Sequence, residues 1–247
     1  MLQTLVHLIK AGRVTPTERF PDLPDHARGL PKLTHAACSD CGACEDACPT
    51  RAITVREKCV TLDLGRCIAC GECVEGCASG TIAADRSTRT AVRKRTDLIL
   101  RSGQSRPVVE SGNPSMFARS LHVREVSTGD NATDLEVAAS INPIFDGGRF
   151  GVHFVASPRH ADALLVTGPV GLAMQEPLRR CFEAMSEPRL VIAVGADAIS
   201  GGLHRDGYAQ ANGVEPILPV DVWIPGAPPH PWSILHGLVV AMGHAAS

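Results

Sequence analysis

Aromatic residues and excess positive charge are scarce in this chain. It contains two Trp, one Tyr and six Phe in 247 residues, too few to build the stacking platforms that bind single-stranded nucleic acid. The formal net charge is −2, so the chain lacks the surplus of Lys and Arg that drives binding to a phosphate backbone. Together these deficits predict that nucleic acid is not a partner.

Signals for export or membrane insertion are scarce as well. The sequence shows no positively charged leader before an apolar core, no small-residue cleavage site and no twin arginine. Its longest nearly uncharged stretch, around residues 163–174, holds two glycines and a proline and is too short to span a bilayer. We therefore expect a protein of the reducing cytoplasm, either soluble or attached peripherally to a membrane.

Familiar catalytic motifs are missing too. The chain has no GxxxxGK[ST] phosphate loop, no G-x-S-x-G elbow and no HExxH pair. Its ten histidines show no zinc-site spacing. We therefore assign no catalytic residue and expect a subunit that is not catalytic alone.

Cysteine is the informative residue type. Nine of the ten cysteines fall between positions 38 and 77, and eight of these form two runs with the spacing C-x2-C-x2-C-x3-C. The runs are Cys38, Cys41, Cys44, Cys48 and Cys67, Cys70, Cys73, Cys77. Pro49 follows the first run, whereas Ala78 follows the second. This is the spacing of bacterial ferredoxins with two [4Fe–4S] clusters.

The spacing also predicts which cysteines share a cluster. Three closely spaced thiolates wrap three corners of a cubane, and the fourth cysteine of each run ligates the other cluster. The predicted ligand sets are Cys38, Cys41, Cys44, Cys77 and Cys67, Cys70, Cys73, Cys48. Zinc is the alternative metal, although zinc sites usually take two C-x2-C pairs separated by a loop. The two remaining thiols, Cys59 and Cys181, are predicted to be buried and inert.

Four regions can be separated along the chain. Residues 1–35 are predicted to be an amphipathic helix followed by a proline-rich linker, and residues 36–84 a ferredoxin domain with a short strand pair at 52–55 and 59–62. Residues 85–125 are predicted to be a basic linker, and residues 126–247 an α/β domain.

Two of these regions allow more than one interpretation. The N-terminal helix can dock on its own protein or lie on a membrane surface or membrane subunit. The basic run of the second linker is either a solvated face or a contact for an acidic partner or anionic lipid. It consists of Arg86, Arg89, Arg93, Lys94 and Arg95.

The last region has the pattern of a buried parallel sheet. Residues 163–167 and 190–194 are short apolar runs, each ending at a glycine, and residues 174–185 between them have helical spacing. A last helix is expected over residues 232–241.

Several of these stretches resemble known subunits. The sequence Leu64–Cys73 resembles the ferredoxin-like subunit of complex I and of the formate hydrogenlyase and hydrogenase-4 complexes. The second half is similar to the small, 20 kDa-like subunit of the same complexes, at residues 122–126, 156–162, 165–170, 187–195 and 219–226. The resemblance implies a fusion of two subunits, with an α+β ferredoxin module joined to an α/β flavodoxin-like parallel-sheet domain.

One departure from the second family concerns its own cluster. The small subunits carry four cysteines for a further [4Fe–4S] cluster, and the aligned positions here are Asp130, Thr133, Asp197 and Ala227. The resemblance therefore implies that this cluster is lost. The vacated space is then either filled by hydrogen-bonded or hydrated polar groups, or holds a hard cation between Asp130 and Asp197 with Asp134 nearby.

These inferences lead to an expected function and its rivals. We expect an electron-transfer subunit with two [4Fe–4S] clusters, peripheral on the cytoplasmic side of the cytoplasmic membrane. The resemblance implies two partners, a hydrogenase-like or complex I 49 kDa-like large subunit and antiporter-like membrane subunits. The alternatives are a structural subunit that docks a large subunit to a membrane arm, and a free ferredoxin-type carrier, against which the large second half argues.

Overall fold

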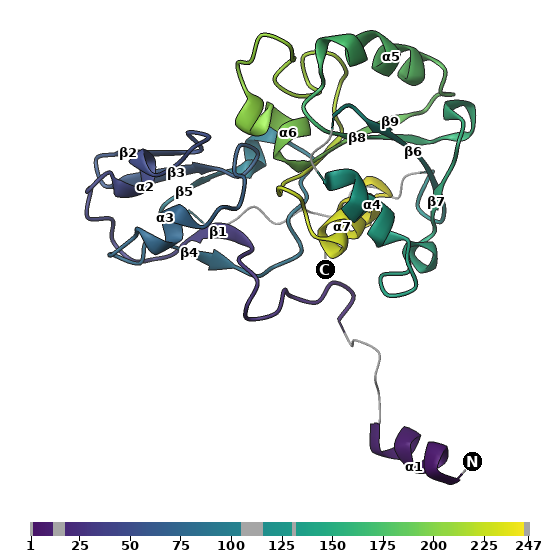
Figure 1. The fold of residues 1–247 in the computed structure, drawn as a ribbon, viewed down its shortest axis with the longest axis horizontal. Helices are drawn as coiled ribbons and strands as arrows, with labels where there is room; N and C mark the ends of the chain where they lie inside the picture. The colour runs from purple at the N-terminus through teal and green to yellow at the C-terminus, as the bar shows by residue number, and fades with distance from the viewer. Residues whose placement is uncertain (1, 12–17, 105–115, 130–131, 245–247) are drawn as a thin grey trace.

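The computed structural model of this chain describes residues 2–11, 18–104, 116–129 and 132–244. Amphipathic spacing produces the first helix, α1 (Leu2–Ala11), with Lys10 in its last turn, where a cation suits the helix dipole. Figure 1 shows α1 apart from the other elements. No helix among the described residues is long and apolar enough to cross a membrane.

The two cysteine runs fold as similar halves of a cysteine-rich body. Each half contains a one-turn helix, α2 (Ala43–Asp46) or α3 (Glu72–Glu75). Strands β1 (Leu30–Leu33) and β4 (Ile82–Asp85) pair antiparallel. Strands β2 (Ile53–Arg56), β3 (Cys59–Asp63) and β5 (Ile99–Arg101) form a second antiparallel sheet. The predicted strand pair thus corresponds to β2 and β3.

Segments predicted as linkers contribute regular structure to both bodies. β1 belongs to residues 1–35, and residues 85–125 supply the short helix η1 (Arg95–Leu98), β5 and the start of β6. Leu30, Leu98 and Leu100 are buried, so the two segments pack through their leucines instead of running free. The ferredoxin fold therefore uses strands from outside residues 36–84, and the four-domain division stays a prediction.

The second body is a five-stranded parallel sheet in the order β10-β9-β8-β6-β7. The strands are β6 (Leu121–Ser127), β7 (Val152–Phe154), β8 (Ala163–Thr167), β9 (Leu190–Val194) and β10 (Val222–Ile224). β8 is buried along its whole length, which explains its unbroken apolar sequence. This is the flavodoxin-like strand order, and the predicted fold class is confirmed.

Helices cover both faces of the parallel sheet (Figure 1). α4 (Thr133–Ser140) and α7 (Pro231–Ala241) pack on one face, and α5 (Leu172–Glu183) packs on the other. The short helix α6 (Gly195–Ser200) follows β9, and single 3₁₀ turns occur at η2 (Gly147–Phe150), η3 (Pro158–His160) and η4 (Gly202–His204). The helices expected over 174–185 and 232–241 correspond to α5 and α7.

The two bodies share one hydrophobic core. A single cluster of buried side chains includes Leu62 and Leu98 on one side and Ile199 on the other. Val92 and Trp223 exchange two backbone hydrogen bonds, of 3.0 and 2.9 Å, across the junction. A Cβ atom at Gly65 would stand 2.8 Å from Ile199 Cγ2, so the loop before the second cysteine run lies directly against α6.

Candidate functional site

The eight predicted ligands gather around two cavities, each lined by cysteines of both runs. We call them the outer set, Cys38, Cys41, Cys44 and Cys77, and the inner set, Cys48, Cys67, Cys70 and Cys73. The structure therefore brings together the same two groups of four that the spacing predicts. Cluster binding by these residues stays a prediction.

Local backbone conformation aims the thiols into the cavities. Gly42 and Gly71 adopt φ values of 74° and 90°, in the left-handed region, and each begins a one-turn helix. Just before these glycines, the loops also donate backbone hydrogen bonds to sulfur. The Asp40 N–H donates to Cys38 Sγ and the Ala69 N–H to Cys67 Sγ, both at 3.4 Å.

The fourth cysteine of each run receives a similar hydrogen bond. The Ala52 N–H donates to Cys48 Sγ at 3.2 Å, and the Ile82 N–H donates to Cys77 Sγ at 3.4 Å. N–H groups directed at sulfur favour thiolate and tune an iron–sulfur site. All four bonds come from the main chain and therefore depend on fold more than on side-chain identity.

The two sets differ in burial. Cys41 of the outer set is exposed, and the Ala43 N–H lowers the pKa of its thiol. Burial raises the pKa of Cys67 to about 12 and that of Cys73 to about 11, so these inner thiols stay protonated at neutral pH without a metal. Metal binding therefore has to displace their protons.

The donor chemistry of both cavities fits iron–sulfur clusters. Four thiols surround each cavity, and the inner one has walls formed by apolar side chains including Ile53, Leu62 and Ile68. Soft thiolate donors in such surroundings are the ligands that [4Fe–4S] clusters take. Throughout the described part of the chain, no three His, Cys, Asp or Glu side chains converge as ligands of one metal ion.

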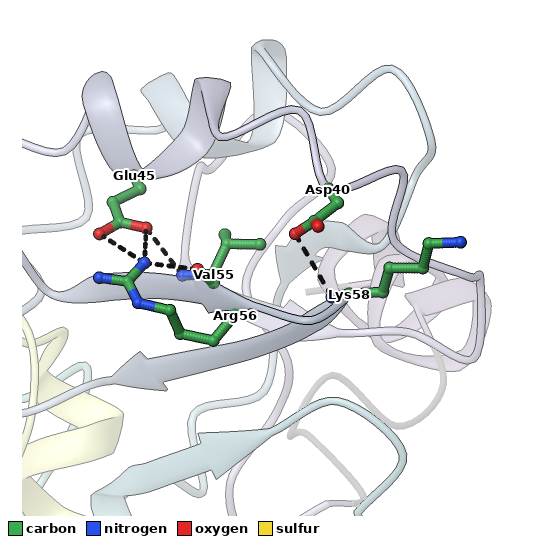
Figure 2. A network of polar contacts seen from close by, with 5 residues as sticks. All are labelled: Asp40, Glu45, Val55, Arg56 and Lys58. Atoms are coloured by element: carbon green, nitrogen blue, oxygen red, sulfur yellow. Dashed lines mark hydrogen bonds and ion pairs between the residues drawn. The ribbon is translucent and has the colours of Figure 1, made fainter.

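Two carboxylates fasten the outer set to the β2–β3 hairpin (Figure 2). Glu45 Oε2 accepts the Val55 N–H at 2.8 Å, and Arg56 Nη1 donates to both Glu45 oxygens at 3.3 and 3.0 Å. The Val55 N–H is the main cause of the lowered pKa of Glu45. Asp40 Oδ1 accepts the Lys58 N–H at 3.3 Å, so the loop between the first two cysteines is also anchored.

The four positions aligned with the lost cluster lie near the carboxyl ends of the parallel strands. Thr133 is fully buried at the start of α4, and a Cβ atom at Gly195 would stand 3.1 Å from its Oγ1 and 3.5 Å from the Gly226 oxygen. Asp197 follows in α6, and Ala227 is exposed in the loop after β10. Asp130, and with it the predicted cation site, lies outside the described residues.

Two features of the site were not predicted from the sequence. Arg28, within a segment interpreted as linker, donates from Nη1 to the Cys70 carbonyl oxygen at 3.1 Å, and no motif spacing marks it. Cys59 is exposed at the start of β3, where Ser102 Oγ donates to its Sγ at 3.6 Å. Its predicted burial is therefore wrong, because the side chain alternates to the solvent face of the strand, and Cys181 is only partly buried.

Comparison with known families divides the chain in two. Residues 131–241 match the family described as NADH ubiquinone oxidoreductase, 20 kDa subunit. Residues 37–81 match the 4Fe-4S dicluster domain.

Curated relatives match about half of the chain. Formate hydrogenlyase subunit 7 of Escherichia coli is 44% identical over 126 residues, 51% of this chain and 49% of the relative. The probable membrane-bound hydrogenase subunit mbhJ of Pyrococcus furiosus is 43% identical over 51% of this chain and 76% of its own. For an NADH-quinone oxidoreductase subunit of Carboxydothermus hydrogenoformans the values are 46%, 49% and 74%. The match thus spans only about half the length of the first of these relatives.

Proposed function

This chain belongs to the family of the 20 kDa subunit of NADH ubiquinone oxidoreductase and carries a 4Fe-4S dicluster domain, and from this premise we propose that it transfers electrons within a membrane-associated, energy-converting hydrogenase-like or complex I-like complex. We propose further that it holds two [4Fe–4S] clusters, both in the cysteine-rich body. The observation that carries this proposal is the pair of cavities, each lined by four cysteines from both runs.

The residues around the cavities have distinct tasks in this proposal. When bound, each cluster supplies one-electron redox chemistry. The eight thiolates hold the iron, and backbone N–H groups directed at sulfur stabilise the charge on the thiolates. The apolar wall of the inner cavity keeps water from the inner set, while the exposed Cys41 leaves the outer set open to a soluble donor.

The α/β body is proposed to hold no cluster. Its four aligned positions offer two carboxylates, one hydroxyl and one methyl group in place of four thiols. Thr133 and Ala227 are poor or impossible iron ligands, so electrons that reach the inner set have no thiolate-bound site beyond it in this chain.

The partners follow from the relatives as proposals. We propose that the α/β body binds a hydrogenase-like or 49 kDa-like large subunit and that the complex includes antiporter-like membrane subunits. The chain would then lie on the cytoplasmic side of the cytoplasmic membrane, attached peripherally.

A second function is favoured by the missing thiols of the α/β body. The chain can join a large subunit to a membrane arm in a complex that has given up hydrogenase chemistry, with its clusters serving another redox partner. The sequence of the large subunit encoded with this chain separates the two proposals. Intact nickel-binding cysteines support electron transfer to that subunit, and their loss supports the docking role.

Iron and sulfide content tests the proposal directly. The chain would be purified anaerobically with any partners that accompany it, and its iron, acid-labile sulfide and low-temperature EPR spectrum measured. About eight irons per chain with a spin-coupled two-cluster signal are expected. About twelve irons would contradict the loss of the third site, and zinc without sulfide would contradict electron transfer.

A further inference from the structure

The inner set lies where the cysteine-rich body meets the α/β body. Ala69, within its cysteine run, lines a cavity together with Pro225 and Gly226 of the loop after β10. The other wall of the inner set is formed by the segment that leads into β1, with Pro31 lining the inner cavity. That segment carries a positive charge to the cysteines.

The charge belongs to Arg28. Its Nη1 donates to the Cys70 carbonyl oxygen at 3.1 Å, and its Cδ lies 3.7 Å from the place that a Cβ atom would occupy on Gly71. Cys70 and Gly71 both line the inner cavity. The backbone beside Arg28 is held firmly, because Gly29 at φ 65° leaves no room for a Cβ atom against the Asp85 carbonyl group.

The outer set has a different neighbour at the equivalent place. Gly42 corresponds to Gly71 in the internal repeat, and the nearest atom to a Cβ built on Gly42 is Asp46 Oδ2 at 4.0 Å. Asp40 corresponds to Ala69, so a carboxylate occupies the first loop where the second has a methyl group (Figure 2). A cation thus contacts one cysteine run, and carboxylates border the other.

A nearby cation favours the reduced form of a thiolate-bound cluster, because reduction adds one negative charge. Charge and hydrogen bonding around the ligands are the means by which a protein sets such a potential. Arg28 is exposed, so solvent screens part of its effect. Glu72 and Glu75 on α3 are exposed as well and act in the opposite direction.

We propose that Arg28 is a positioning residue of the inner set that raises the reduction potential of the cluster bound there. This inference rests on the proposed function, since it needs clusters in both sets. Its consequence is directional: the guanidinium biases a single electron toward the inner set, beside the α/β body, and away from the exposed outer set.

Substitutions at position 28 separate charge from hydrogen bonding. Arg28→Gln keeps a donor for the Cys70 oxygen but removes the charge, and Arg28→Lys keeps the charge. Lys32→Gln is the matched control, because it removes one positive charge from the same segment, at a side chain that pairs with Asp85 at 3.9 Å. Each full-length variant would be purified anaerobically with its partners, assayed for iron and titrated by EPR against potential.

The expected result is selective. Arg28→Gln should lower the midpoint of one cluster, decreasing its reduced-to-oxidised ratio at fixed potential between about threefold and tenfold, where tenfold equals about 59 mV for one electron. The other midpoint should stay within error, and the positive charge retained in Arg28→Lys should preserve most of the wild-type value. Lys32→Gln should shift neither cluster.

Two results would overturn the inference alone. One is eight irons with both midpoints unchanged in Arg28→Gln. The other is a loss of about four irons in that variant while Arg28→Lys stays loaded, since it would make the residue only an anchor. Failure of the wild-type chain to bind iron and sulfide would instead overturn the proposed function, and the inference with it.

Discussion

At the scale of single residues, the crossing of ligands between the two cysteine runs decides the site. Cys48 belongs to the first run in sequence but lines the inner cavity, and Cys77 belongs to the second run but lines the outer one. Both positions could be predicted from spacing, because this ligand geometry is local and repeats. Arg28 could not, since its contact spans 42 positions and involves no motif.

Serine substitutions test this crossing. Cys77→Ser should disturb the EPR signal of the cluster bound by Cys38, Cys41 and Cys44, and Cys48→Ser the signal of the other, with a loss of up to about four irons each. Cys59→Ser is the control, because its exposed thiol lines neither cavity. Loss of the same signal in both ligand variants would contradict the crossed assignment.

Glu125 on β6 is a partly buried carboxyl group whose pKa is raised to about 7, mainly by burial and further by Asp134. Its Oε1 has no hydrogen-bond partner within the part of the chain that the structure describes. The folded state therefore binds more protons than the unfolded state between about pH 4.5 and 7, so the contribution of Glu125 to stability is lost as pH rises through that window.

Substitution of Glu125 should remove this pH dependence. Glu125→Gln is expected to raise the free energy of unfolding at pH 8 by about 1 kcal/mol, a value reduced for solvent screening, and to change it little at about pH 5. Thermal unfolding at both pH values measures this. Glu176→Gln, at an exposed position of α5, serves as control, and equal effects at the two pH values would refute the assignment.

At the scale of elements, the strongly patterned segments were predictable and the short paired ones were not. β8 and β9 are uninterrupted apolar runs because both faces of the sheet are covered, and their sequence alone indicates it. β1 and β5 have four and three residues and gain stability only from pairing with distant strands. Such pairing leaves no local pattern, which is why both fell within segments interpreted as linkers.

The link between β3 and η1 offers a test at this scale. Arg95 donates two hydrogen bonds to the Asp63 carboxylate at 2.8 and 2.7 Å, and the two side chains are only 20% and 18% exposed. Asp63→Asn leaves the guanidinium without its counter-charge and should cost about 2 kcal/mol of unfolding free energy, measured by denaturant titration. Asp22→Asn, at a more exposed pair with Arg89, should cost less than about 0.5 kcal/mol.

At the scale of the whole molecule, the cysteine-rich and α/β bodies unite around a common core. The sequence indicated two modules but not their joint, because the joining residues are ordinary apolar side chains such as Leu98 and Ile199. The vacated position in the α/β body likewise emerged only by resemblance to cysteines that this chain lacks. No composition or spacing of the chain itself would have revealed it.

A common core predicts cooperative unfolding. The cluster-loaded chain, scanned anaerobically by calorimetry, should show one transition for residues of both bodies, because separating them exposes buried apolar surface. Intrinsic fluorescence of Trp223 and Trp232, in the α/β body, should change at the same temperature as the loss of cluster absorbance. Two well-separated transitions would show that the bodies unfold independently.

The Val92–Trp223 bridge and the core around it also have a consequence for the supply of subunits. A protein built of the α/β body alone would depend on a ferredoxin-like partner from another chain, whose level can vary. Here the two bodies are translated together, so every assembled complex receives them in equal number. A cell that makes this protein controls both with one gene and needs no step that brings them together.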